Sequence, residues 1–180
     1  DEAWTQVVGL PGNAGEAMGF DVAICDGLIA AGCPNANSST GSVRTWFIDS
    51  DMKLIEGQTL SPFGYANAHA GFAVDLHRSD AGDAYLVIGA PGMAPEGGDV
   101  LTQGGVAVYC MPIGMTSWTQ VDIQSGPPGL YAYGYAVGMG EEANGIYALV
   151  GVPQYDLGDP LTSNSGMVVV LTGTTDSTSW

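Results

Sequence analysis

Short apolar runs that end on a glycine and a proline recur along the chain. One lies at 86–91, with the sequence Leu-Val-Ile-Gly-Ala-Pro, and related runs lie at 28–34 and 148–153. They are spaced by roughly 60 residues, which is typical of a chain built from structural repeats. Each run has the length and composition of a β-strand that stops at a turn.

Further β-type segments flank each run. Before it stands a glycine, an aromatic residue, a variable residue and a valine, at 19–22, 71–74 and 134–137. After it, beyond a polar loop, a second apolar run opens on small residues, at 41–47, 104–110 and 165–171. A fourth element follows in the first two units, at 52–55 and 118–123. Because no stretch sustains helical periodicity, the pattern predicts an all-β fold with four-stranded units, the layout of a β-propeller blade.

The repeats divide the chain into three units of about one blade each, at 10–57, 58–124 and 125–180. The segment Trp-Thr-Gln-Val at 4–7 is identical to that at 118–121, so a strand at 4–8 is expected to belong to a preceding or neighbouring blade. The third unit's own fourth strand is expected to begin at 177–180. Three blades do not close a ring, so we expect a partial propeller, or a part of a larger or oligomeric one.

The series Gly-aromatic-x-Val, Gly-Ala-Pro and Gly-x-Val-x-Val-Tyr resembles the FG-GAP repeats, which are the blades of the integrin α-subunit propeller. The resemblance covers nearly all 180 residues. It implies three four-stranded antiparallel blades in a non-enzymatic extracellular or surface module for protein or glycan binding, adhesion or structural assembly. The alternative is an accessory propeller domain of a larger secreted hydrolase. Open strand edges imply self-assembly or contact with a missing remainder of the propeller.

Charge excludes several classes of partner. The chain has 19 acidic residues against 3 Lys and Arg, and a formal net charge of −16. This balance argues against nucleic acid and anionic lipid, which both require basic residues. No apolar stretch is long enough for a membrane helix, so membrane insertion is not expected. The segment 1–3 does not begin a secretory signal, so the extracellular location that the resemblance implies requires a signal already removed.

The first hairpin of the second unit holds a candidate calcium site. Many FG-GAP blades resemble an EF-hand-like loop at this place, with oxygen ligands at alternate positions. Asp75 and Asp83 match its two ends, and Ser79 takes a central position. The other central position is His77, and Arg78 adds a repulsive charge. A polar hairpin is therefore the preferred interpretation, with calcium as the alternative.

The three cysteines are predicted to be reduced, small apolar residues. The pair Asp26 and Gly27 predicts a two-residue hairpin turn. That turn would separate Cys25 from Cys33 by about five residues along the ladder, roughly 16 Å. A disulfide needs Cα atoms within about 7 Å. Only a wider, irregular hairpin would allow this bridge, and Cys110 falls in another strand.

Two kinds of surface site complete the candidates. The segment 37–39, Asn-Ser-Ser, is a glycosylation sequon with Asn37 as the acceptor, in a loop rich in polar residues. Loop residues on one face resemble the ligand face of integrin propellers; these candidates are Phe63, Tyr65, Tyr131, Tyr133, Asp156 and Asp159. The preferred alternative for the aromatic residues is that they wedge between adjacent blades.

Enzyme signatures do not support a catalytic function. The sequence has no Cys-x-x-Cys, no His-Glu-x-x-His and no phosphate-binding glycine loop before a helix. His69 and His77 are the only histidines, and neither has a matching cluster of ligands in the sequence. We therefore predict that this chain is not an enzyme.

Overall fold

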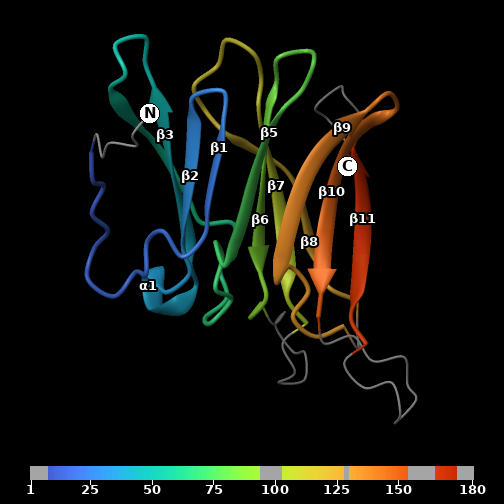
Figure 1. The fold of residues 1–180 in the computed structure, drawn as a ribbon. Coiled ribbons are helices and arrows are strands. Elements are labelled where there is room, and N and C mark those ends of the chain that lie inside the picture. Colours follow the sequence, from blue (N-terminus) through green and yellow to red (C-terminus); the bar gives the residue numbers. More distant parts are fainter. Residues whose placement is uncertain (1–7, 94–102, 128–129, 154–164, 174–180) are drawn as a thin grey trace, which may run out of the picture.

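A computed structural model describes residues 8–93, 103–127, 130–153 and 165–173. In this part of the chain eleven strands form three antiparallel sheets, so the all-β prediction is confirmed (Figure 1). The first sheet contains β1 (Val22–Cys25), β2 (Leu28–Cys33), β3 (Ser42–Ile48) and β4 (Leu54–Leu60). The second contains β5 (Ala73–Arg78), β6 (Ala84–Ala90), β7 (Gly105–Met111) and β8 (Thr119–Ser125). The third contains β9 (Ala136–Glu142), β10 (Gly145–Val152) and β11 (Met167–Gly173).

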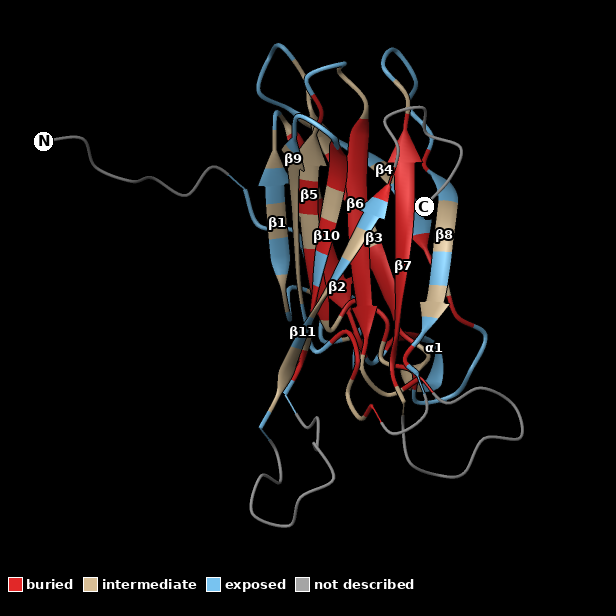
Figure 2. Ribbon diagram, turned by 90° about the vertical axis from the view of Figure 1, so that its right-hand side faces the viewer, coloured by how far each residue is buried: buried red, intermediate tan, exposed pale blue. Residues whose placement is uncertain are grey.

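The second sheet lies between the other two and determines where the core forms. β6 and β7 are buried at every position, whereas β1 alternates between exposed and half-buried residues, as does β11 up to the buried Gly173 (Figure 2). A strand that is covered on both faces reads as a continuous apolar run, and a strand covered on one face alternates. The run at 86–91 is the clearest in the sequence because it belongs to this central sheet.

Two apolar layers hold the three sheets together. The layer between the first and second sheets includes Val43, Leu86 and Ile88, all fully buried. The layer between the second and third sheets includes Val87 and Val150, which are also fully buried. Successive residues of β6 thus face opposite neighbours, as the two-residue period of a strand requires.

Consecutive sheets meet at their first strands, with β5 beside β1 and β9 beside β5 (Figure 1). A Cβ atom built on Gly32 would lie 1.8 Å from the carbonyl oxygen of Gly71, and one built on Gly89 would lie 2.1 Å from that of Gly134. The glycines of the repeated runs are therefore required by the close approach of the next sheet's backbone.

The predicted first hairpin is confirmed. Cys25 pairs with Leu28 across the turn at Asp26 and Gly27, and all three cysteines are free. Cys33 and Cys110 are buried, and Cys25 is half-buried.

Two predicted segments differ from the structure. The fourth strand of the first unit was expected at 52–55, but β4 begins at Leu54 and ends at Leu60. Met52 has φ 59° in a turn closed by the Asp49 N–H donating to the Lys53 carbonyl at 2.9 Å, so the strand starts only after that turn. The polar loop after β2 contains a four-residue helix, α1 (Ala36–Ser39), interrupted by left-handed residues. Residues 4–7 of the predicted strand at 4–8 lie outside the described residues.

Substitution of Gly89 tests the close approach between sheets. In Gly89→Ala the new methyl group occupies the place of the Gly134 carbonyl oxygen, so the second and third sheets must move apart. We expect the free energy of unfolding, measured by urea denaturation, to fall by about 3 kcal/mol.

The matched control for this substitution is Gly140→Ala in β9. A Cβ atom there meets nothing within 4 Å. Its unfolding free energy should stay within about 0.5 kcal/mol of the parent value. Equal losses in both variants would show that the backbone approach at Gly89 has no special role.

Candidate functional site

Three aromatic rings lie in a row at the end of the molecule where β1, β5 and β9 begin. We call Phe20, Phe72 and Tyr135 the aromatic row. The ring centroids of Phe20 and Phe72 are 4.7 Å apart, and those of Phe72 and Tyr135 are 4.8 Å apart. The rings are tilted by 44° and 50°, within the usual geometry of aromatic pairs.

The repeat itself positions these rings. Each follows a glycine with positive φ, namely 82° at Gly19, 83° at Gly71 and 85° at Gly134. Because the first strands lie side by side, this shared backbone turn brings the rings of three distant segments together. Phe20 and Tyr135 are exposed, and Phe72 is half-buried between them.

From the sequence, the residues of the aromatic row were predicted to belong to a strand motif, but it was not predicted that they form a surface. The signal that could have identified it is the Gly-aromatic pattern at 19–20, 71–72 and 134–135, in three first strands that the fold places side by side. An exposed apolar group of this kind is a feature of ligand or protein contacts.

The predicted ligand-face residues fall into three groups. Phe63 and Tyr133 are buried in the layers between sheets, so they are not available to a ligand and act as wedges. Tyr65 is exposed and Tyr131 is half-buried, so both reach the surface. Asp156 and Asp159 lie outside the described residues.

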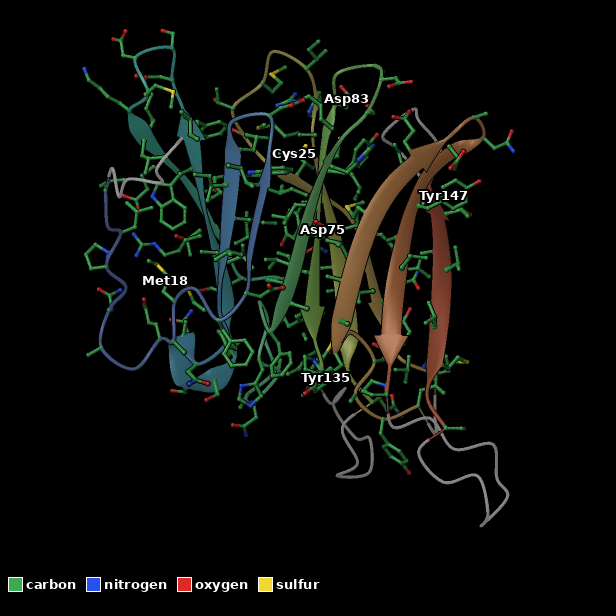
Figure 3. All side chains as sticks on the ribbon, in the orientation of Figure 1. Met18, Cys25, Asp75, Asp83, Tyr135 and Tyr147 are labelled. Carbon is green, nitrogen blue, oxygen red and sulfur yellow. The ribbon has the colours of Figure 1, made fainter. Side chains whose placement is uncertain are left out.

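The predicted calcium ligands do not converge on one point. Asp75 pairs with Val87 in the middle of β5, while Ser79 and Asp83 belong to the turn after it (Figure 3). The Asp83 N–H donates to Ser79 Oγ at 3.1 Å, and Asp83 Oδ1 accepts from the Ile113 N–H at 2.8 Å. Ser79 therefore serves the backbone of its own turn, and Asp83 joins this turn to the segment after β7.

Asp75 has a different role, which it shares with Asp21. Asp21 Oδ2 accepts from the Val74 N–H at 2.8 Å, and Asp75 Oδ2 accepts from the Met139 N–H at 2.7 Å. The other oxygen of each carboxylate accepts from the next N–H of its own strand. Each first strand pairs with only one strand of its sheet. The two carboxylates therefore link consecutive sheets by binding N–H groups on these free edges.

An acidic open cavity of about 540 Å³ lies at the opposite end, between the second and third sheets. His77, Asp80, Glu141 and Glu142 line it. His77 Nε2 lies 3.5 Å from Glu141 Oε2, which accepts from the Asp80 N–H at 2.7 Å. Among the described residues no group of three or more His, Cys, Asp or Glu side chains is arranged to hold a metal ion.

The buried thiols are not placed for nucleophilic chemistry. Burial raises the pKa of Cys33, and the negative charge of Glu16 adds to this effect. Burial also raises the pKa of Cys110, with a further contribution from Asp83. Both thiols therefore stay neutral at pH 7, and only the thiolate is a nucleophile.

Asn37, the predicted glycosylation acceptor, is exposed in α1. It has φ 52°, and Ser38 and Ser39 follow with φ 59° and 65°. This left-handed turn projects from the chain between β2 and β3, so the side chain is open to solvent. Whether a sugar is attached there stays a prediction.

Comparisons with known proteins complete the description of the site. Scans against protein-family models and against curated proteins gave no match. In the part of the chain that the structure describes, no helix has the length and apolar composition needed to cross a membrane.

The carboxylate link of Asp75 can be tested by substitution. Asp75→Ala removes the acceptor of the Leu76 and Met139 N–H groups. We expect a loss of about 3 kcal/mol in unfolding free energy, because hydrogen bonds to charged groups are stronger than neutral ones. Hydrogen exchange at the Met139 amide should also become faster, which reports the link itself.

Asp51→Ala is the matched control, because Asp51 is exposed in the turn between β3 and β4. It should change the unfolding free energy by less than about 0.5 kcal/mol. An unchanged exchange rate at Met139 in Asp75→Ala would contradict the proposed link.

Ionisation of the two buried thiols should make the protein less stable as the pH rises. The pKa values of Cys33 and Cys110 are raised on folding, so folding favours their neutral form. Their contribution to stability is complete below the ordinary thiol pKa of about 8.5 and is lost as the pH rises above it. The urea midpoint should therefore fall between about pH 7.5 and pH 9.5.

A double variant, Cys33→Ala with Cys110→Ala, should show a smaller fall over the same range.

In the native protein a thiol reagent should modify Cys25 first, because Cys33 and Cys110 are buried. Equal reaction rates for the three thiols would be inconsistent with this burial.

Proposed function

We propose that the three sheets are consecutive blades of a β-propeller-type repeat of the FG-GAP kind. The support is that the same glycine contact between sheets occurs twice, each time with a carboxylate link nearby. In both cases a first strand lies beside the preceding first strand, a glycine carbonyl approaches a bare glycine, and a carboxylate links the two edges. A contact that repeats in this way is characteristic of a repeat architecture.

We further propose that the chain is a non-enzymatic extracellular or surface module that binds a protein or glycan. The aromatic row is the observation that carries this proposal. Its rings offer apolar faces that suit the C–H face of a sugar ring or an apolar side chain of a protein. The Tyr135 hydroxyl adds a polar contact beside these faces, a combination that is common at recognition surfaces.

The state of the potential catalytic groups supports a binding function over catalysis. His69 Nδ1 lies 3.2 Å from the Pro34 carbonyl oxygen, and His77 faces Glu141 at the far end of the sheets. The carboxylates of Asp21 and Asp75 are occupied by backbone N–H groups. These groups serve the fold and do not surround a common reaction centre.

Net charge and surface composition suit an extracellular setting. A formal net charge of −16 keeps the molecule soluble and repels nucleic acid and anionic lipid. The exposed Asn37 is compatible with passage through a glycosylating compartment. This location is part of the proposal.

A binding array tests the function. Dilute purified chain is applied to an array of extracellular glycans and protein ectodomains, and each hit is compared with the double variant Phe20→Ser, Tyr135→Ser. We expect at least one saturable hit that weakens tenfold or more in this variant, about 1.4 kcal/mol. Absence of any saturable hit with folded protein would overturn the binding function.

Ile113→Ser is the matched control for this test. Ile113 is exposed after β7, at the end of the sheets opposite the aromatic row. Its substitution should leave binding of each hit unchanged. Equal losses in the control and the double variant would place the binding surface elsewhere.

A further inference from the structure

The outer face of the third sheet is apolar, and no described residue of another sheet packs on it. We call Leu149, Gly151, Gly166, Val168 and Val170 the acceptor face. Leu149 is 48% exposed, Val168 is 66% exposed and Val170 is 55% exposed. An open cavity of about 500 Å³ lies at one end of this face, with Tyr135, Gly151 and Val168 in its lining.

Strand register shows what covers the same positions in the other two sheets. Val168 pairs with Gly151 as Val106 pairs with Gly89 and Val43 with Gly32. Val43 and Val106 are fully buried because the next sheet packs on them. By the same register Leu149 corresponds to Val87 and Ala30, which are also fully buried.

The glycines of the acceptor face repeat this relationship. At Gly32 and Gly89 the next sheet's glycine carbonyl fills the place of a Cβ atom. At Gly151 the nearest neighbour of a Cβ atom is Ala136 of the same sheet, at 3.2 Å. No backbone of a following sheet is present among the described residues, so the position that admits a carbonyl is open.

Gly166 provides a second, independent position. Gly41 and Gly104 have φ 85° and 78° and form parallel bridges with Ala70 and Tyr133 of the next unit. Gly166 has φ 73° and the same place before the third strand of its sheet, but its nearest atoms belong to its own unit at 3.6 Å or more. The third sheet thus has both glycine positions that would receive a following sheet, and no described residue of a following sheet occupies either of them.

The first sheet, on the other side of the second sheet from the acceptor face, carries a strand that could fill this face. We call residues 19–24 the donor strand. Val22 is 63% exposed and Ile24 is 69% exposed, whereas their counterparts Val74 and Leu76 are buried against the preceding sheet. A Cβ atom on Gly19 would meet nothing within 4 Å, unlike one on Gly71 or Gly134.

We propose that the acceptor face binds the donor strand of a second copy of this chain. Gly19 of one copy approaches Gly151 of the other, and Phe20 stacks beside Tyr135, so the aromatic row continues across the contact. The two surfaces differ, so the association is head-to-tail and can extend beyond two copies. The inference rests on the repeat packing put forward in the proposed function.

Charge opposes this contact and makes it sensitive to salt. Within the chain, Arg78 of the second sheet pairs with Asp26 of the first, with Nε 3.4 Å from Oδ2. In the proposed contact Asp26 of the second copy would instead lie near Glu141 and Glu142 of the third sheet. Added salt screens this repulsion, so association should strengthen with ionic strength.

Sedimentation velocity of the full chain over a range of protein and salt concentrations tests the proposal. The parent chain should show concentration-dependent association that increases with salt. Val168→Gln inactivates the acceptor face and Ile24→Gln inactivates the donor strand, with no change of charge. Each variant alone should associate at least tenfold more weakly than the parent.

A mixture of the two variants gives the decisive result. Each retains one intact surface, so the mixture should form a one-to-one dimer that does not grow further. Circular dichroism and urea midpoints confirm that both variants fold. A parent chain that stays monomeric at high salt, a mixture that stays monomeric, or variants that associate like the parent would each overturn the proposal.

These outcomes are separate from the test of ligand binding. A folded monomeric chain that still binds its array ligand would overturn the head-to-tail contact alone. A chain that associates but gives no array hit would overturn the binding function and leave this contact standing.

Discussion

The structure depends on the close approach of two glycine backbones where consecutive sheets meet. With no side chain at Gly32 or Gly89, a carbonyl oxygen of the next first strand comes within 2.1 Å of the position that a Cβ atom would take. This approach brings the free edges of the first strands close enough for Asp21 and Asp75 to reach across. It also places the aromatic residue after each positive-φ glycine beside its predecessor. Core packing, carboxylate links and the aromatic row therefore share one steric condition.

The same condition explains why the three sheets differ in composition although they share a pattern. The second sheet has neighbours on both sides, so β6 and β7 are apolar at every position. The third sheet buries one face and leaves the other open, whereas the first sheet is exposed at Val22 and Ile24 of β1 but buries Ala31, Cys33 and Trp46. The exposed positions of both sheets still carry valine, isoleucine and leucine, which a solvent-facing strand does not need. The apolar residues on these faces make sense as halves of a contact that the molecule already forms twice internally.

Much of the fold could be predicted from the sequence because turns and close approaches require particular residues. Asp26 and Gly27 defined the first hairpin and thereby the distance between Cys25 and Cys33. Which side chains are buried, and which way each side chain points, could not be predicted in the same way. Phe63 and Tyr133 have the composition of surface recognition residues, yet both lie in the layers between sheets. Asp75 suits a metal loop by spacing, but the register places it in mid-strand, where a neighbouring N–H takes its carboxylate.

The third unit shows how register refines a sequence comparison. Composition aligns Ser165 with Gly104, but strand pairing places Val168 opposite Gly151, so Gly166 is the counterpart of Gly104 and Gly41. With this one-residue correction the third sheet has both glycines that receive a following sheet. A glycine inside a strand costs about 0.5–1 kcal/mol relative to alanine. In the first two sheets the approach of the next backbone offsets that cost, and at Gly151 a second copy of the donor strand would do the same.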